Sequence, residues 1–440
     1  MLRTEASVSS REVLAQASNE TPRGGRVQSI DIVRGAVMLL MAIDHVRVYS
    51  GLPAGGPTAG IFLTRWITHF VAPAFIFLAG TSAFLHGRKL ADTRALAHFL
   101  VTRGLWLVLL ELTMLRVAWT FNFDFSHYLL AGVIWVIGWC MVLLAGLIFL
   151  PVRVLAAFGL VVVLGHNILD RFSQSLYAMV EKSHWAWLWQ ILYFGGPIQI
   201  SEHGPTLFVL YSIVPWVGVM ALGYVFGRVM ITDELSRRRM CLTLGTTCIV
   251  AFLVLRGLNF YGDPRPWVAP AHPASVQGQI SGAPASATAA SPAPVAPPRR
   301  PQAPAWISFL NTTKYPASLL FLLMTLGPML LVLPLVEHAS DRVTSVLKIF
   351  GRVPFFYYVL HIPLIHLAAL FVSLLRTGSV APWLFMNHPV MNPPSPPGYV
   401  WSLGLLYLVW VIVVAMLYLP CRWFAGLKQR RKDSRFLSYL

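Results

Sequence analysis

Uninterrupted apolar segments recur along most of this 440-residue chain, and a segment of about 20 residues can cross a hydrocarbon core of about 30 Å as a helix. Lipid does not tolerate open sheet edges, and the strands of outer-membrane barrels alternate apolar and polar residues, so continuous runs predict transmembrane helices. Only 12% of the residues are charged, against roughly 25% in an average soluble protein. We therefore expect an all-α, polytopic transmembrane helix bundle, and not a soluble α/β enzyme or a β-sandwich.

The apolar runs give about ten spans, with an eleventh left open. Their expected limits are 29–49, 61–85, 98–119, 128–150, 153–170, 206–228, 240–258, 315–336, 349–375 and 399–420. Residues 181–200 carry three tryptophans and predict a helix lying at the membrane interface. Most of the 34 Lys and Arg residues fall on one side of this arrangement, which places both termini in the cytoplasm by the positive-inside rule.

These limits predict five regions along the chain. They are a cytoplasmic tail (1–28), a first membrane block (29–258), an extracytoplasmic loop rich in Pro and Ala (259–314), a second membrane block (315–420) and a basic cytoplasmic tail (421–440). The low-complexity part of the loop, 269–305, is expected to be disordered and to carry no chemistry.

Ionisable residues inside the spans are the main functional candidates, because each costs at least ~2.5 kcal/mol to insert. In the first span a helix places Asp31, Arg34 and His45 on one stripe, with Met38 and Met41 between them. The stripe runs from an Asp/Arg pair at the cytoplasmic end to His45 near the outer end. His45 is a candidate for proton transfer. Asp44 points about 100° away from it around the helix.

Two later spans carry further candidates. Glu111 is deep in the third span, where its partner is Arg34, Arg116 or Arg256, and a structural ion pair and a catalytic carboxylate are equally open. In the ninth span Tyr357 and His361 share a face at i,i+4, whereas His366 points elsewhere.

Short polar clusters on the outer side are candidates for binding a polyhydroxylated acceptor such as a carbohydrate. Their Trp and Tyr residues are equally typical of an interfacial aromatic belt. The residues that we select from these clusters, together with a histidine of the second span, are His69, Asn122, Asp124, Arg256, Asn259 and Asp263.

Three segments carry a family resemblance. They are Arg26-Val-Gln-Ser-Ile-Asp31-Ile-Val-Arg34-Gly35 with its apolar helix ending in Asp44-His45, Phe70-Val-Ala-Pro73-Ala-Phe-Ile-Phe-Leu-Ala-Gly80, and Gly351-Arg352-Val-Pro-Phe-Phe-Tyr-Tyr-Val-Leu-His361. The first resembles the start of the catalytic domain of heparan-α-glucosaminide N-acetyltransferase and its bacterial relatives. It is more distantly similar to type-3 membrane acyltransferases. The similarity is most specific over 26–90 and extends to about residue 370.

The resemblance implies a membrane enzyme that takes an acetyl or other acyl group from cytoplasmic acyl-CoA and delivers it to an acceptor on the other side. It implies His45 as base or acyl carrier, with Asp31 and Arg34 at the cytoplasmic mouth. The family's active histidine lies in the connection after the first helix. Residues 51–60 hold none, and His45 and His69 are the nearest.

On this hypothesis Asp44, Glu111 and His361 are further catalytic candidates. CoA phosphates would need cations at the cytoplasmic face, where Arg26, Arg34, Arg88, Arg103 and Arg352 are available. The expected location is a bacterial cytoplasmic membrane.

Two other classes of function stay open from the sequence. A transporter or flippase would use the buried charges as a relay without covalent chemistry, and a structural protein would use them to fix helix packing. The sequence carries no Walker loop, dinucleotide fingerprint or zinc motif, so we expect no metal and no permanently bound cofactor. The expected partners are the bilayer and a small-molecule or glycan acceptor, not nucleic acid. The oligomeric state, a homodimer included, is left open.

Overall fold

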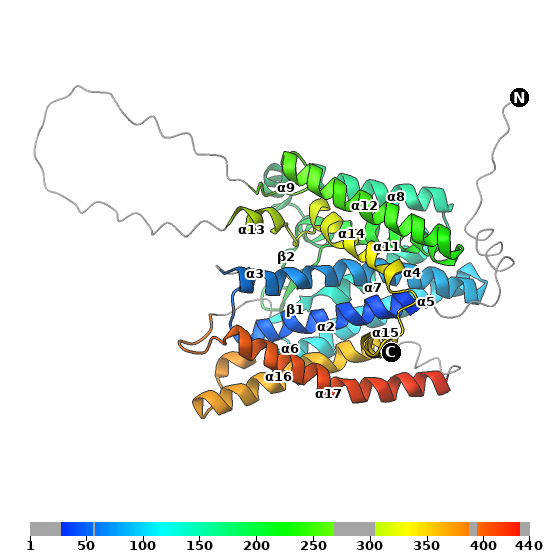
Figure 1. Ribbon diagram of the computed structural model, residues 1–440. Helices are drawn as coiled ribbons and strands as arrows, with labels where there is room; N and C mark the ends of the chain where they lie inside the picture. The colour runs from blue at the N-terminus through cyan, green and yellow to red at the C-terminus, as the bar shows by residue number, and fades with distance from the viewer. Residues whose placement is uncertain (1–27, 56–57, 268–303, 387–393, 432–440) are drawn as a thin grey trace, which may run out of the picture.

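A computed structural model describes residues 28–55, 58–267, 304–386 and 394–431. The residues form a bundle of roughly parallel helices, with α8 and α12 along one margin, α16 and α17 along the other, and α2 and α4 between them (Figure 1). The helices in the first part of the bundle are α2 (Gln28–Ser50), α3 (Ala59–Trp66), η1 (Ile67–Phe70), α4 (Val71–Leu90), α5 (Thr93–Leu110), η2 (Glu111–Leu115), α6 (Arg116–Thr120), α7 (Val133–Leu147), α8 (Val152–Gly165), η3 (His166–Phe172) and α9 (Ser173–Val180). The later ones are α10 (Ala186–Trp189), η4 (Gln190–Phe194), α11 (Ile213–Phe226), η5 (Val229–Ile231), α12 (Glu234–Leu258), α13 (Ala305–Leu310), α14 (Leu319–Leu335), α15 (Arg342–Arg352), α16 (Pro354–Thr377), η6 (Pro382–Phe385) and α17 (Leu403–Arg430).

Helices lie at all ten positions where the sequence predicts spans, and the expected all-α membrane bundle is confirmed. Seven helical segments of the described chain are long and apolar enough to cross a membrane: Ala59–Leu90, Thr93–Thr120, Val152–Val180, Ile213–Ile231, Glu234–Leu258, Pro354–Thr377 and Leu403–Arg430. The apolar helices α7 and α14 are shorter. The number of crossings and the side of the termini stay predictions. The tail 1–27 and residues 268–303 of the Pro/Ala-rich loop lie outside the described residues.

Three short strands form a small sheet that the hydropathy pattern did not reveal. β1 (Tyr128–Ala131) pairs parallel with β3 (Thr206–Val209), and β2 (Gly196–Gln199) pairs antiparallel with β3. The spans expected from residues 128 and 206 therefore begin later, at α7 and α11. A short apolar strand cannot be told from the start of a buried helix by periodicity. The interfacial helix expected over 181–200 is likewise reduced to α10 and η4, followed by β2.

Two helix boundaries also differ from expectation. The ninth span is divided, since α15 ends at Arg352 and α16 begins at Pro354. Val353 between them has φ −130° and ψ 49°, consistent with the exclusion of a residue before proline from the helical region. At the other end of the chain α17 continues to Arg430, so residues 421–430 of the predicted basic tail are helical.

Helix α2 lies at the centre of the bundle and packs against α4, α15, α16 and α17. Its contact with α15 is a backbone-to-backbone approach, because a Cβ on Gly35 would lie 1.9 Å from the carbonyl oxygen of Leu347 and one on Gly351 would lie 1.8 Å from that of Asp31. Small residues allow such close helix packing in membranes. The approach fixes the start of α16 beside the polar stripe of α2.

Candidate functional site

The polar stripe of α2 faces two cavities, one toward each end of the bundle. The first, of about 440 Å³, contains Asp31, Arg34 and Met38 in its wall, and the second, of about 220 Å³, contains Met41 and His45. Residues of the predicted stripe therefore line both cavities. We call the first the basic cavity, after its cations Arg34, Lys89, Arg103, Arg352 and Lys428, and the second the histidine cavity, whose ionisable lining is Asp44, His45, Arg47, Arg65, Glu111 and Lys314.

The basic cavity lies between the start of α2, the end of α4 and the start of α16. Arg34 is oriented by three contacts: Nη2 donates to Ser82 Oγ (2.6 Å), and Nη1 donates to the Gly351 carbonyl oxygen (3.3 Å) and lies 3.6 Å from Asp31 Oδ1. The predicted Asp31/Arg34 pair therefore forms. Of the other arginines considered for phosphate binding, Arg103 and Arg352 line the cavity, Arg88 does not, and Arg26 lies outside the described residues.

His45 and His361 form a hydrogen-bonded pair at the histidine cavity, joining α2 to α16 with 2.7 Å between His45 Nδ1 and His361 Nε2. A carbonyl oxygen only accepts, so His361 Nδ1 carries the hydrogen that bonds the Tyr358 carbonyl at 2.6 Å. Neutral His361 then accepts through Nε2, and His45 donates through Nδ1. His45 Nε2 is left unprotonated, with no partner among the described residues.

Asp44 does not orient His45, as the helix geometry predicted. Its Oδ1 lies 2.8 Å from Nε of Arg47, which also donates to the Leu52 carbonyl oxygen (3.1 Å). Both side chains line the histidine cavity. Asp44 is therefore held as one member of a fixed ion pair beside the histidines.

Glu111 begins the π-helical turn η2, a feature frequent at functional sites. None of its three suggested arginine partners pairs with it. Its Oε2 accepts a hydrogen bond from the backbone N–H of Ile134 (3.0 Å) at the start of α7. The N-cap residue Gly132 has no side chain to do this, and a Cβ there would lie 2.5 Å from Glu111 Oε1. Glu111 thus caps α7 while forming part of the wall of the histidine cavity.

Val133 and Tyr358 line both cavities. The two cavities therefore share these two side chains in their walls, and the basic residues line one cavity while His45 lines the other. Tyr358 is nearly buried, and its ring packs edge-on against His361 with centroids 5.1 Å apart.

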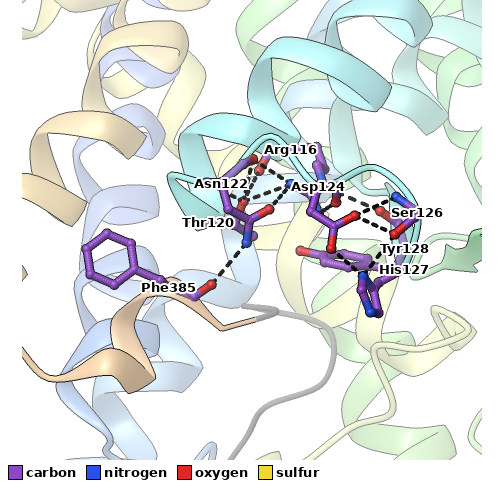
Figure 2. A network of polar contacts seen from close by, with 8 residues as sticks. All are labelled: Arg116, Thr120, Asn122, Asp124, Ser126, His127, Tyr128 and Phe385. Atoms are coloured by element: carbon purple, nitrogen blue, oxygen red, sulfur yellow. Dashed lines mark hydrogen bonds and ion pairs between the residues drawn. The ribbon is translucent and has the colours of Figure 1, made fainter.

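The polar side chains of Asn122 and Asp124, predicted to bind substrate, form hydrogen bonds within the protein. Buried Arg116 donates to the Asn122 side-chain oxygen (2.5 Å) and to the carbonyl oxygen of Asp124, and Asn122 Nδ2 donates to the Phe385 carbonyl oxygen (3.0 Å), as Figure 2 shows. Hydrogen bonds from Ser126 lower the pKa of Asp124. These polar groups hold a loop together, and neither residue lines the histidine cavity.

The cluster after α12 is organised in the same way. Arg256 donates to the carbonyl oxygens of Phe309, Arg265, Ser308 and Asn311. Asp263 accepts from Thr313 and Ser318, and Asn259 is the left-handed C-cap of α12. The three predicted substrate-binding residues are therefore scaffold for the segment that leads to α14.

The other two histidines considered as candidates, His69 and His366, line neither cavity. His69 is buried against Phe321, and neither of its ring nitrogens has a partner in the described part of the chain. His366 stacks on Tyr49 and Phe121, away from His361 as its position on the helix predicted.

The sequence analysis missed several cavity residues. Lys89 and Lys428 stand at helix ends, where basic residues are expected for topology alone, and Arg65 was counted inside an apolar span. Lys314 is the last residue of the predicted outer loop. The neighbouring Tyr211 and Tyr315 are linked by their hydroxyls at 3.3 Å. No motif marks these residues, because it is the packing of distant segments that brings them together.

Comparison with known families agrees with this architecture. Residues 26–261, more than half of the chain, match the family model described as heparan-alpha-glucosaminide N-acetyltransferase, catalytic. The chain belongs to this family. It is an integral, multi-pass membrane protein of acyltransferase type. No curated protein matches it.

The heparan-alpha-glucosaminide N-acetyltransferase match spans α2 to α12 and contains Arg34, His45 and Glu111. Helices α14 to α17 lie beyond it. Outside the matched segment, Arg352 lines the basic cavity and Lys314 the histidine cavity, and His361, the hydrogen-bond partner of His45, also lies outside it.

Proposed function

We propose that the protein transfers an acyl group from cytoplasmic acyl-CoA, held in the basic cavity, to an acceptor in the histidine cavity. The observation that carries this proposal is that the two cavities share Val133 and Tyr358 in their walls, with cations lining one cavity and His45, hydrogen-bonded to His361, lining the other. A thioester extending from the basic cavity toward Tyr358 would bring its carbonyl carbon close to His45.

The basic cavity suits the phosphates of the donor. Arginine grips phosphate with paired hydrogen bonds, and lysine contributes a compact charge. The cavity has five cations in its wall against the single carboxylate of Asp31. Its volume, about 440 Å³, is within the range of ~300–1,000 Å³ typical of small-molecule sites. The acyl-pantetheine arm, which is largely uncharged, suits the apolar lining formed by Phe99, Leu107 and Ile137.

His45 is the base in this reaction. Its free Nε2 takes the proton from the acceptor hydroxyl or amine, whose oxygen or nitrogen bonds to the thioester carbonyl carbon. The C–S bond breaks, and the CoA thiolate receives the proton from His45. In the variant in which His45 carries the acyl group, Nε2 attacks the thioester carbonyl carbon, the C–S bond breaks and CoA leaves as the thiolate. The acceptor oxygen or nitrogen then bonds to the acyl carbon, the bond from that carbon to Nε2 breaks, and the acceptor proton passes to the CoA thiolate. His361 is a positioning residue that keeps the proton of His45 on Nδ1 in both cases.

The test uses purified full-length protein in nanodiscs with radiolabelled acetyl-CoA. Wild type should release CoA and transfer label to a sugar or amine acceptor, and His45→Ala should lose about 10²–10⁴-fold in rate, the usual contribution of a positioned base. His127→Ala, at an exposed histidine outside the cavities, is the control. Equal rates for His45→Ala and wild type would remove His45 from the mechanism. Tight CoA binding without any acyl transfer would favour the alternative function, a transporter or flippase without covalent chemistry.

A further inference from the structure

The charges of the histidine cavity do not balance. Three cations, Arg47, Arg65 and Lys314, share its wall with two carboxyl groups, Asp44 and Glu111. Asp44 pairs with Arg47 at 2.8 Å, and Glu111 accepts the backbone hydrogen bond of Ile134. No acidic side chain of the described cavity wall is left for the other two cations.

Arg65 and Lys314 are the unmatched charges. Within the described ranges neither forms an ion pair or a side-chain hydrogen bond, and the only ring near the Lys314 ammonium is that of Tyr315, with Nζ 5.1 Å from the centroid. Lys314 is only 9% exposed. A buried charge without a partner is costly, and in membrane proteins such charges mark substrate or ion pathways.

The two cations converge from different parts of the chain. Arg65 is in the last turn of α3, whereas Lys314 precedes α14 and is fixed by a backbone bridge to Ala317. Both line the same cavity as His45 and the Asp44–Arg47 ion pair. Their charges are therefore concentrated beside the histidine pair.

We infer that Arg65 and Lys314 form a binding site for an oxyanion, a carboxylate or phosphate carried by the molecule that is acylated at His45. That the bound molecule is the acceptor rests on the proposed function. The presence of an anion site does not depend on the proposed function. A cavity of about 220 Å³ is below the usual ~300–1,000 Å³, which limits the occupant to a group of about monosaccharide size. The Tyr211 and Tyr315 hydroxyls at the same cavity suit a polyhydroxylated body.

The experiment compares three probes of similar size on purified full-length protein in nanodiscs, by thermal shift at constant ionic strength. Glucuronate carries a carboxylate, glucose 6-phosphate a phosphate, and glucose no charge. We expect saturable stabilisation by at least one charged probe and none by glucose at the same concentrations, because ligand binding to the folded state raises its melting temperature. The two charged probes decide which oxyanion is preferred.

Variants locate the binding. Lys314→Met and Arg65→Gln should each raise the dissociation constant of the charged probe about tenfold or more, as expected for removing one member of a buried charge pair. Lys314→Arg should keep binding, which separates loss of charge from loss of folding. Arg171→Gln removes a cation of η3 that contacts Phe260 outside the cavity and should change nothing.

Three results would overturn the inference. The first is stabilisation by glucose equal to that by the charged probes, and the second is unchanged affinity for the charged probe in both Lys314→Met and Arg65→Gln. The third is loss of that affinity in Arg34→Ala instead, which would place the probe in the basic cavity. A CoA titration on the same samples separates the two proposals. Failure to bind CoA with intact anion binding contradicts the proposed function alone, whereas the reverse outcome contradicts only the oxyanion site.

Discussion

His361 determines which nitrogen of His45 carries the proton. Its Nδ1–H is bonded to a backbone carbonyl of its own helix, so its Nε2 is available only as an acceptor while the ring is neutral. His45 must then present Nε2 as a base toward the cavity. In the proposed mechanism His361 is therefore a positioning residue, and the substrate contacts His45.

Replacing His361 tests this role. We expect His361→Leu to lower kcat by about 10²-fold with little change in the KM for acyl-CoA, because the proposed donor site is the other cavity. His361→Gln, whose amide oxygen can accept from Nδ1–H, should restore part of the rate. Steady-state kinetics on the purified variants measure both parameters. A KM effect without a kcat effect would assign His361 to binding or folding.

Asn122 provides the opposite case, a polar residue that the sequence suggested for substrate and that the structure places in a scaffold. We expect Asn122→Ala to lower the free energy of unfolding by about 1–3 kcal/mol, because part of the buried Arg116 guanidinium loses its partner. The KM for the acceptor should not change. His127→Ala in the same loop is the control, with a change of about 0.5 kcal/mol or less. A raised acceptor KM in Asn122→Ala with normal stability would return this residue to the site.

The residues of α2 could be predicted from sequence because a single helix fixes their relative positions. Asp31, Arg34 and His45 follow helical spacing, and the structure places them in the walls of the two cavities. The pairing of His45 with His361 could not be predicted. The two are 316 positions apart, and only the packing of α16 against α2 brings them together.

At the scale of elements, the approach of α15 to α2 controls the shape of the basic cavity. The Gly351 carbonyl oxygen accepts from Arg34, and the Cα of the same glycine lies against the backbone of Asp31. The division of α15 from α16 at Val353 and Pro354 allows this approach. Pro354 is visible in the sequence, but the continuous hydropathy around it led to a single predicted span.

We expect Gly351→Ala to separate these helices, because its Cβ would lie 1.8 Å from the Asp31 carbonyl oxygen. Overpacking of this kind costs about 1–3 kcal/mol, and the displaced Arg34 should also weaken CoA binding. Thermal denaturation and CoA titration of the same sample measure the two effects. Gly146→Ala is the matched control, since nothing lies within 4 Å of the added Cβ. Wild-type stability in Gly351→Ala would contradict the close contact.

For the whole molecule, the helix positions follow from hydropathy, because twenty apolar residues have few other stable conformations in lipid. The short sheet could not be predicted from hydropathy, because the hydropathy pattern of its short apolar strands is the same as that of helix ends. In Figure 1 the start of α2 and the end of α17 lie at one end of the bundle, and α3 and α13 lie at the other. This arrangement agrees with one basic side and one outer side.

The orientation predicts the result of reporter fusions. A reporter fused after Leu440 should give a cytoplasmic signal, and one inserted between residues 269 and 303 should give an extracytoplasmic signal. The reason is that most basic residues lie on the side of the bundle that is predicted to hold both termini. The same signal from both fusions would contradict the assigned topology and, with it, donor entry from the cytoplasm.

The proposed reaction requires acyl-CoA to bind in the basic cavity, within reach of His45. A calorimetric titration of CoA into purified protein tests it most directly, with Arg34→Ala compared with wild type. Arg94→Ala, an exposed arginine that does not line the cavity, is the matched control. We expect Arg34→Ala to bind CoA at least about tenfold more weakly, because it loses charge-assisted hydrogen bonds to phosphate. Arg94→Ala should bind CoA like wild type. Equal affinity in all three proteins, or no binding to any of them, would contradict donor binding in the basic cavity.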